Sequence, residues 1–191
     1  METGVGKVHS VPIVSIVGRS RSGKTLLMEQ LIAEFKGRGY RVAALKHSRG
    51  GMEVDYPGKD SWRFTKAGSD AVLVSSPGKL ALIKSVEREP EIDEILRTIG
   101  PDFDIVLAEG FKRSNLPKIE VHRGDLGGEL VCPSDELLAV VTDVHLDAGV
   151  ARLSMNDTGA IADLIEQSVV RPVQASGVRS PVANEEELQQ I

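Results

Sequence analysis

Short apolar, β-branched runs alternate with helical patterns along the chain. The runs cover residues 11–17, 40–46, 71–75, 80–85, 103–108, 119–122 and 137–142. Segments such as 104–108 and 137–141 show little polar alternation, which is typical of central strands covered on both faces. Helices are expected at 24–36, 60–67, 91–99 and 157–168, the last with Asn156 or Asp157 as its N-cap. The alternation predicts an α/β fold with a mostly parallel sheet.

Turn and tail signals set the expected domain organisation. Pro77-Gly78 between two apolar runs predicts a hairpin, and we expect this antiparallel element at one edge of the sheet. From about Pro172 the apolar pattern fades toward the run of glutamates at 185–187. A chain of 191 residues suits one well-buried domain. We therefore predict a single domain over residues 1–171 and a flexible tail over 172–191.

Composition narrows the function classes. A net charge of −5 argues against broad binding to nucleic acid, which requires clustered basic residues. The apolar stretches are shorter than the roughly 20 residues of a membrane-spanning helix, and the N-terminus lacks a secretion signal. The single cysteine, Cys132, excludes an internal disulfide and is expected to have no chemical role. These features predict a cytoplasmic protein that binds neither nucleic acid nor membrane.

A phosphate-binding loop follows the first apolar run. It consists of Gly18, Arg19, Ser20, Arg21, Ser22, Gly23, Lys24 and Thr25. Glycines at the two ends let backbone N–H groups turn toward phosphate oxygens, while Lys24 adds a charge and Thr25 offers a hydroxyl to magnesium. The helix that begins here points the positive end of its dipole at the same phosphates. We predict a nucleoside triphosphate ligand and a P-loop NTPase-like three-layer fold.

Glu109 ends the apolar strand 103–108, at the carboxyl edge where open α/β folds bind their ligands. There it is predicted to act in catalysis with Lys24, by holding magnesium-bound water or by orienting an attacking water. The alternative is a salt bridge to Lys24 or Lys112.

The long polar segment 46–62 leaves the carboxyl end of another strand. Its Asp55, together with Lys46 and Lys59, is a candidate contact to the triphosphate, its magnesium or a second anion. Asp60 could do the same or simply cap the following helix. His47 is expected to make local hydrogen bonds, and the histidine spacing does not predict a zinc site.

Asp143 ends the strand 137–142 at the same edge. Its carboxylate could accept hydrogen bonds from the ring N–H and amino group of guanine, which adenine cannot supply in the same pattern. The Asn-Lys-x-Asp motif of signalling GTPases is absent, so the spacing leaves guanine and adenine open. Lys112, Arg113 and Lys118 follow Glu109 and form either a solvated rim or contacts to a second phosphate.

Several of these runs together resemble one family. They are Gly18-x-x-x-x-Gly-Lys-Thr25, Lys46-His47, Asp55-x-Pro57-Gly-Lys-Asp-Ser-Trp62, Lys66-Ala67-Gly68, Glu109-Gly-Phe-Lys112, Lys118-Ile119, Thr142-Asp143 and Met155-Asn156-Asp157. From about Ile13 to Ile165 the chain is similar to the MobB family of molybdopterin-guanine dinucleotide biosynthesis adapter proteins. It departs from the family at 48–51, where members often carry further histidines, and in the two loop arginines.

The resemblance implies a homodimer that binds GTP with Mg²⁺ and has weak GTPase activity. Such a protein helps a molybdenum cofactor guanylyltransferase to convert molybdopterin to its guanine dinucleotide, and molybdopterin or Mo-molybdopterin is a further candidate ligand. The resemblance also implies nucleotide or magnesium contacts for Gly18–Thr25, Asp55, Glu109 and Asp143.

Two other function classes share the phosphate loop. A small-molecule kinase would transfer the γ-phosphoryl group to an acceptor, but it usually needs an arginine-bearing lid, and the sequence has no convincing one. A pure scaffold would bind phosphate without turnover. Slow hydrolysis fits the sequence because Glu109 is the one obvious candidate to position water and no arginine finger is evident. The hairpin at Lys79–Val86 could also join two copies of the chain.

Overall fold

The structure, a computed structural model, describes residues 11–48, 50, 55–146 and 148–176. The chain divides into two compact units, of which the first combines residues up to His47 with those from Leu96 onward. The second unit consists of residues 48–95. The phosphate loop belongs to the first unit, and Asp55 to the second.

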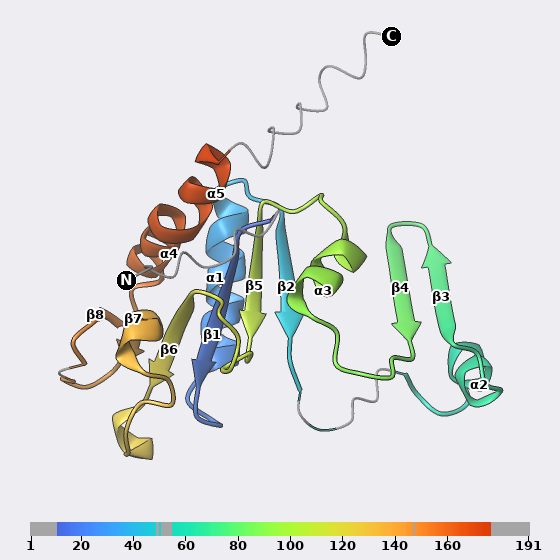
Figure 1. Cartoon of the computed structure of the whole chain (residues 1–191), viewed down its shortest axis with the longest axis horizontal. Helices are drawn as coiled ribbons and strands as arrows, with labels where there is room; N and C mark the ends of the chain where they lie inside the picture. Colours follow the sequence, from blue (N-terminus) through green and yellow to red (C-terminus); the bar gives the residue numbers. More distant parts are fainter. Residues whose placement is uncertain (1–10, 49, 51–54, 147, 177–191) are drawn as a thin grey trace, which may run out of the picture. The chain divides into compact units, whose positions relative to one another are not determined.

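A six-stranded parallel sheet forms the centre of the first unit (Figure 1). Its strands are β1 (Ile13–Gly18), β2 (Val42–Lys46), β5 (Ile105–Glu109), β6 (Lys118–His122), β7 (Leu137–Thr142) and β8 (Ala151–Ser154), in the order β2-β5-β1-β6-β7-β8. All neighbouring pairs are parallel. β1 is buried throughout, and so is β5 except at its last residue, which explains their continuous apolar runs. The fold class predicted from the sequence is confirmed.

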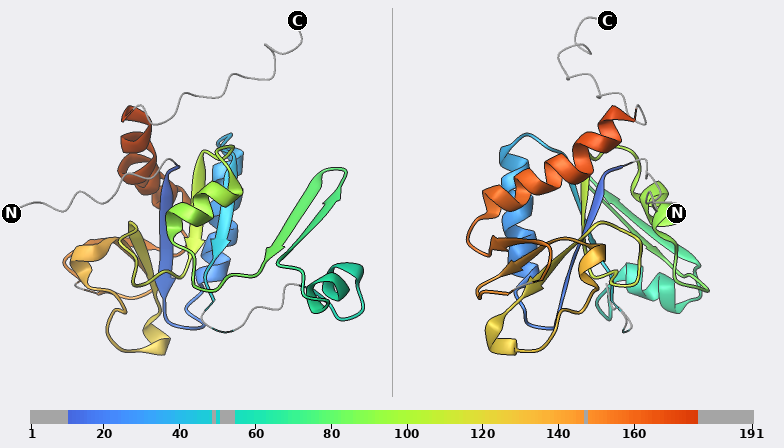
Figure 2. Two further views of the ribbon diagram at one scale, coloured as in Figure 1. Left: turned by 45° about the vertical axis from the view of Figure 1, so that its right-hand side comes forward. Right: turned by 60° about the vertical axis from the view of Figure 1, so that its left-hand side comes forward.

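Two helices, α1 (Lys24–Gly37) and α4 (Thr158–Ile165), pack together on one face of this sheet (Figure 2). Phe35 of α1 and Ile161 of α4 are fully buried in the same cluster as Ile16 of β1. The side chain of Asp157 accepts a hydrogen bond from the backbone N–H of Ala160 and so caps α4, as predicted. The helix continues through a π-helical turn (Glu166–Val170) into α5 (Arg171–Ala175).

Loop segments cover the opposite face of β6 and β7. Alternation along β6 places Lys118, Glu120 and His122 on this face, and all three are buried. The carboxylate of Glu120 accepts hydrogen bonds from the backbone N–H groups of Val131 (2.7 Å) and Cys132 (3.0 Å). A buried charge thus holds the chain between β6 and β7 against the sheet. Two short 3-10 helices, η1 (Gly124–Leu126) and η2 (Ser134–Glu136), lie in the same connection.

The second unit contains α2 (Asp60–Lys66) and a hairpin of β3 (Ala71–Ser76) and β4 (Lys79–Lys84). The hairpin predicted from Pro77-Gly78 is confirmed, and Gly78 adopts a positive φ of 79° in its turn. Its predicted place is wrong, because the two strands form a separate two-stranded sheet and do not extend the main one. β3 and β4 pair with each other along their whole length, and such local pairing needs little loop-closure entropy. α3 (Ile92–Ile99) spans the boundary between the units.

Strand β8 and the end of the last helix were not predicted from the sequence. β8 has four residues and lies at the edge of the sheet, too short to give a periodic signal. Helix α5 runs to Ala175, past the predicted start of the tail at 172, and residues 177–191 lie outside the described part of the chain. No helix among the described residues is long and apolar enough to cross a membrane.

Candidate functional site

The phosphate-binding sequence forms the turn between β1 and α1. Gly18 and Gly23 have positive φ angles of 143° and 95°, and Arg21 adopts a left-handed conformation with φ 64°. A Cβ atom on Gly18 would lie 2.4 Å from the backbone oxygen of Val121, so glycine is required there by contact as well as by conformation. Ser22 is buried, and its hydroxyl has no hydrogen-bond partner in the described part of the chain. The turn therefore has the strained, close-packed backbone expected of an anion-binding loop.

Lys24 begins α1 at the end of the loop. Its Nζ donates a hydrogen bond to the backbone oxygen of Arg19 at 2.6 Å. Partial burial lowers the pKa of Lys24, and the nearby carboxylate of Glu109 acts in the opposite direction, while Lys112 and Lys46 add to the lowering. A phosphate that met this ammonium would replace a carbonyl contact with a full charge pair.

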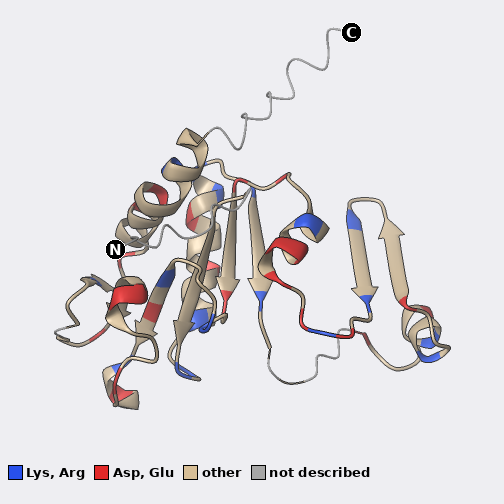
Figure 3. Ribbon diagram, in the orientation of Figure 1, with Lys and Arg blue, Asp and Glu red and all other residues tan. Residues whose placement is uncertain are grey.

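Glu109 reaches the loop from the end of β5. The hydroxyl of Thr25 donates to Glu109 Oε2 at 3.2 Å, and Lys46 Nζ lies 3.8 Å from Oε1. Figure 3 shows a basic residue at the carboxyl end of β2 and an acidic residue at that of β5. The expected proximity of Glu109 to the phosphate loop is therefore present in the structure.

The chain beside Glu109 is tightly fixed. The backbone N–H of His47 donates to the carbonyl of Glu109 at 2.9 Å, and the ring of His47 packs on Phe111 with centroids 4.8 Å apart. Phe111 has a positive φ of 53°, an unusual conformation for a bulky side chain. The turn that follows Glu109 is thus held in one position beside the loop.

The oxygen atoms of Thr25 and Glu109 fit a magnesium ion. Mg²⁺ in nucleotide sites takes one or two protein oxygens and completes its octahedron with phosphate oxygens and water. Within the described residues there is no group of three or more His, Cys, Asp or Glu side chains that could hold a metal by itself. A magnesium ion at Thr25 and Glu109 would thus take its remaining ligands from phosphate oxygens or water.

A cavity of about 350 Å³ lies beside the loop, at the carboxyl ends of β7 and β8. It is lined by Leu26, Leu27, Gln30, Arg123, Thr142, Asp143, Ser154, Met155 and Asn156. The cavity borders the phosphate loop, because a Cβ on Gly23 would lie 3.1 Å from Met155 Cε. Its size suits a small planar ligand, and its walls combine apolar and polar side chains. Sequence reasoning missed Leu26, Gln30 and Asn156 as site residues because four separate segments of the chain form this cavity.

Asp143 lies in that cavity, but its carboxylate already has partners. Oδ1 accepts a hydrogen bond from the backbone N–H of Gly124 at 2.9 Å. Arg123 Nε lies 2.9 Å from Oδ2, with an orientation that makes an ion pair and no hydrogen bond. The Gly124 N–H, followed by the charge of Arg123, lowers the pKa of Asp143, so the group is a carboxylate at neutral pH.

Three other predicted contacts lie in the second unit. Oδ1 of Asp55 accepts a hydrogen bond from the backbone N–H of Tyr56 at 2.9 Å, and Oδ2 is buried without a partner among the described residues. Lys59 precedes α2, and its Nζ lies 5.1 Å from the centroid of the Tyr56 ring. Asp60 is the first residue of that helix. Contacts from Asp55, Lys59 or Asp60 to the nucleotide remain predictions.

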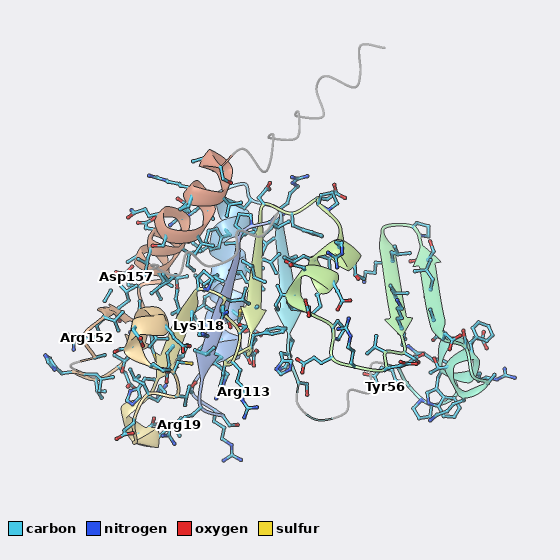
Figure 4. The ribbon with its side chains drawn as sticks, viewed as in Figure 1. Arg19, Tyr56, Arg113, Lys118, Arg152 and Asp157 are labelled. Atoms are coloured by element: carbon cyan, nitrogen blue, oxygen red, sulfur yellow. The ribbon has the colours of Figure 1, made fainter. Side chains whose placement is uncertain are left out.

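The prediction that Lys118 could contact a second phosphate is wrong. It begins β6, pairs with Ser15 in the sheet, and is 2% exposed. Its Nζ forms an ion pair with Glu136 at 2.6 Å. Figure 4 shows Lys118 on the sheet, while Arg19 and Arg113 lie toward its carboxyl edge. Lys118 therefore has a structural role, and Lys112 and Arg113 remain the candidates.

The chain is similar to known families and structures. The family model "Molybdopterin guanine dinucleotide synthesis protein B" matches residues 13–143. A molybdopterin-guanine dinucleotide biosynthesis adapter protein of Haemophilus influenzae is 37% identical over 159 residues, 83% of this chain and 89% of that protein. The Escherichia coli adapter protein is 35% identical over 161 residues, 81% of this chain and 91% of that protein.

The chain is also similar to two solved structures of MobB proteins. The crystal structure of a molybdopterin-guanine biosynthesis protein B has a TM-score of 0.63 at 30% identity, covering 81% of this chain and 98% of that chain. The crystal structure of Bacillus subtilis MobB has a TM-score of 0.66 at 26% identity, covering 83% of this chain and 98% of that chain.

Proposed function

Because this chain belongs to the MobB family, we propose that it is a GTP-binding adapter in molybdopterin guanine dinucleotide biosynthesis. In this proposal it binds GTP with Mg²⁺, hydrolyses it slowly, and assists a guanylyltransferase in the cytoplasm. The observation that carries the nucleotide part is the group formed by Lys24, Thr25 and Glu109 at one end of the strained loop. The one cysteine, Cys132, is a buried free thiol, which suits a reducing compartment such as the cytoplasm.

Each residue of this group has a distinct task. Lys24 would leave the carbonyl of Arg19 and bind the phosphates, while Thr25 would bind the metal directly. Glu109 would hold metal-bound water, since its carboxylate is already turned to Thr25 and Lys46. Magnesium, when bound, neutralises charge that develops on the phosphate oxygens.

The cavity beside the loop is the proposed base site. Leu26 is an exposed apolar side chain on the first turn of α1, and with Met155 it offers a surface on which a flat ring can stack. Asp143 is the proposed guanine contact, because a carboxylate pairs with the two neighbouring N–H donors of guanine.

The base contact is testable with one substitution. Asp143→Asn retains an oxygen for Gly124 and replaces the other acceptor with a donor. GTP affinity should fall about tenfold or more, while xanthosine triphosphate, which presents a carbonyl in place of the amino group, should bind more tightly than to the wild type. Calorimetric titration measures both. Unchanged GTP affinity would remove Asp143 from the base site.

A homodimer is also proposed, on the evidence of the hairpin. Val72 is buried and Ile83 is half-buried, but the other large apolar side chains of the two strands are exposed, with Leu73 at 62% and Leu80 at 70%. An isolated two-stranded sheet is marginally stable in water and gains from being covered. Light scattering should give twice the monomer mass for the wild type and a monomer for Leu80→Asp. A wild-type monomer at all concentrations would contradict the proposal.

The adapter role is tested by reconstitution with a purified guanylyltransferase, molybdopterin cofactor and limiting GTP. Wild-type protein should raise the yield of the guanine dinucleotide, and Lys24→Ala should not. Arg97→Ala, which removes an exposed arginine of α3, is the control for loss of one basic side chain. Equal stimulation by Lys24→Ala would favour a scaffold that acts without nucleotide.

A further inference from the structure

Residues 124–129, which we call the 124–129 segment, are held at both ends by side chains of the nucleotide site. Arg19 of the phosphate loop binds the end of the segment at Glu129, and Asp143 of the proposed base site binds its beginning at Gly124. The segment begins with the 3-10 helix η1 and lies between β6 and β7. Neither contact is needed to complete the sheet.

The contact with Arg19 is close. Arg19 Nη2 donates to the backbone oxygen of Glu129 at 3.1 Å. The guanidinium also lies directly over Gly128, where a Cβ atom would stand 2.5 Å from Nη2. Gly128 has a φ of 80°. Glycine at this position therefore allows the arginine of the phosphate loop to rest on the backbone of the segment.

Both carboxylate oxygens of Asp143 have partners at the start of the segment. The Gly124 N–H donates to Oδ1 at 2.9 Å, and Arg123, the residue before the segment, pairs with Oδ2. Arg123 also donates to Asp125 at 3.3 Å. A ligand that used the carboxylate of Asp143 would therefore compete with the start of the segment.

Further contacts fix the chain that flanks the segment and one residue within it, Gly128. Glu120 binds the N–H groups of Val131 and Cys132, and His122 bridges Thr142 Oγ1 and the carbonyl of Gly128 at 3.3 and 3.2 Å. A change at Arg19 and Asp143 would thus be confined to a short stretch. Among the described residues, His122 also contacts the carbonyl of Gly128 in this stretch, and Val144 packs against Gly124.

We propose that the 124–129 segment responds to nucleotide: GTP draws Arg19 to its phosphates and Asp143 to its base, and the segment is released from both. The driving force comes from Arg19, which exchanges an exposed neutral carbonyl for an anion, and charge-assisted hydrogen bonds are the stronger ones. By linkage, a molecule that binds only the released segment and GTP would each raise the affinity of the protein for the other by the same factor. This inference rests on the proposed function, because it requires a nucleotide in that site.

Hydrogen exchange of peptides covering residues 123–132 tests the proposal. In the wild type, saturating GTP with Mg²⁺ should speed exchange in this region by about fivefold or more, the range typical of coupled sites. Arg19→Ala should show raised exchange without nucleotide and a smaller response to it. Exchange that is unchanged or slower in the GTP-bound wild type would overturn the proposal.

Two glycine substitutions separate the Arg19 contact from backbone strain. Gly128→Ala and Gly127→Ala both place a side chain at a positive φ, but only the former meets Arg19, since a Cβ on Gly127 has nothing within 4 Å. Gly128→Ala should raise exchange more than Gly127→Ala, and the excess should vanish in an Arg19→Ala background. An excess that persists in that background would also contradict the proposal.

Calorimetry on the same samples keeps the two claims apart. If GTP does not bind the wild type, the proposed function fails and, with it, the premise of the inference. If GTP binds and exchange in 123–132 does not rise, the inference alone fails.

Discussion

Gly18→Ala gives a sharp test of how the phosphate loop is built. The substitution places a methyl group 2.4 Å from the backbone oxygen of Val121 and 2.9 Å from the hydroxyl of Ser22. Val121 pairs with Gly18 across β1 and β6, so its oxygen cannot move away without disturbing the centre of the sheet. The positive φ of 143° adds backbone strain.

The two costs can be estimated separately. Holding a non-glycine residue in such a conformation costs about 1–3 kcal/mol. Forcing a methyl group into close-packed surroundings costs about 1–3 kcal/mol more. The free energy of unfolding should therefore fall by about 2–6 kcal/mol, which for a chain of this size lowers Tm by roughly 5–20 °C.

Urea unfolding followed by circular dichroism measures this change. Gly37→Ala is the matched control, because a Cβ there has nothing within 4 Å and the residue lies in α1 with an ordinary φ. That control should be neutral or stabilising by about 0.4–1 kcal/mol. A loss below about 1 kcal/mol for Gly18→Ala would refute the close approach between β1 and β6 on which the loop depends.

Three further results are expected. Arg38→Met should lower the free energy of unfolding by about 1–2 kcal/mol in chemical denaturation, since Arg38 bridges α1 and α4 through Glu34 (2.8 Å) and Asp163 (2.7 Å); an unchanged midpoint would contradict this. Burial, followed by the charge of the Glu120 carboxylate, raises the pKa of the Cys132 thiol, so Ellman's reagent should react slowly until urea is added, and fast reaction of folded protein would contradict the burial. Because the raised pKa belongs to the folded state, the stability from this thiol is present below the unfolded pKa of about 9 and is lost as pH rises through the folded value. Glu109→Gln should slow GTP hydrolysis at least tenfold in a phosphate-release assay while the protein still binds GTP; full turnover would exclude the carboxylate from the reaction.

The sequence was most informative where function depends on local structure. The phosphate loop and its flanking strand and helix are contiguous, so motif and periodicity located all of them. Glu109 was placed correctly by a general rule, because the carboxyl ends of parallel strands share one edge of the sheet. The cap at Asp157 followed from the same kind of local signal.

Long-range arrangement was beyond sequence reasoning. In the sequence, Lys118 lies near other basic residues and resembles part of a basic loop. In the structure it belongs to a strand whose alternation directs its side chain to the interior, where it pairs with Glu136. The cavity beside the loop is assembled from α1, Arg123 after β6, the end of β7 and the residues before α4, and no sequence spacing connects these four segments. The contact between Arg19 and Glu129 joins residues 110 positions apart and has no sequence signature.

Calorimetric titration of GTP and ATP, each with Mg²⁺, into the wild-type protein tests the central claim most directly. The account predicts saturable GTP binding that is about tenfold or more tighter than ATP binding, because Asp143 pairs with guanine and not with adenine. Equal affinities, or tighter binding of ATP, would contradict the assignment of the cavity as a guanine site and favour a kinase.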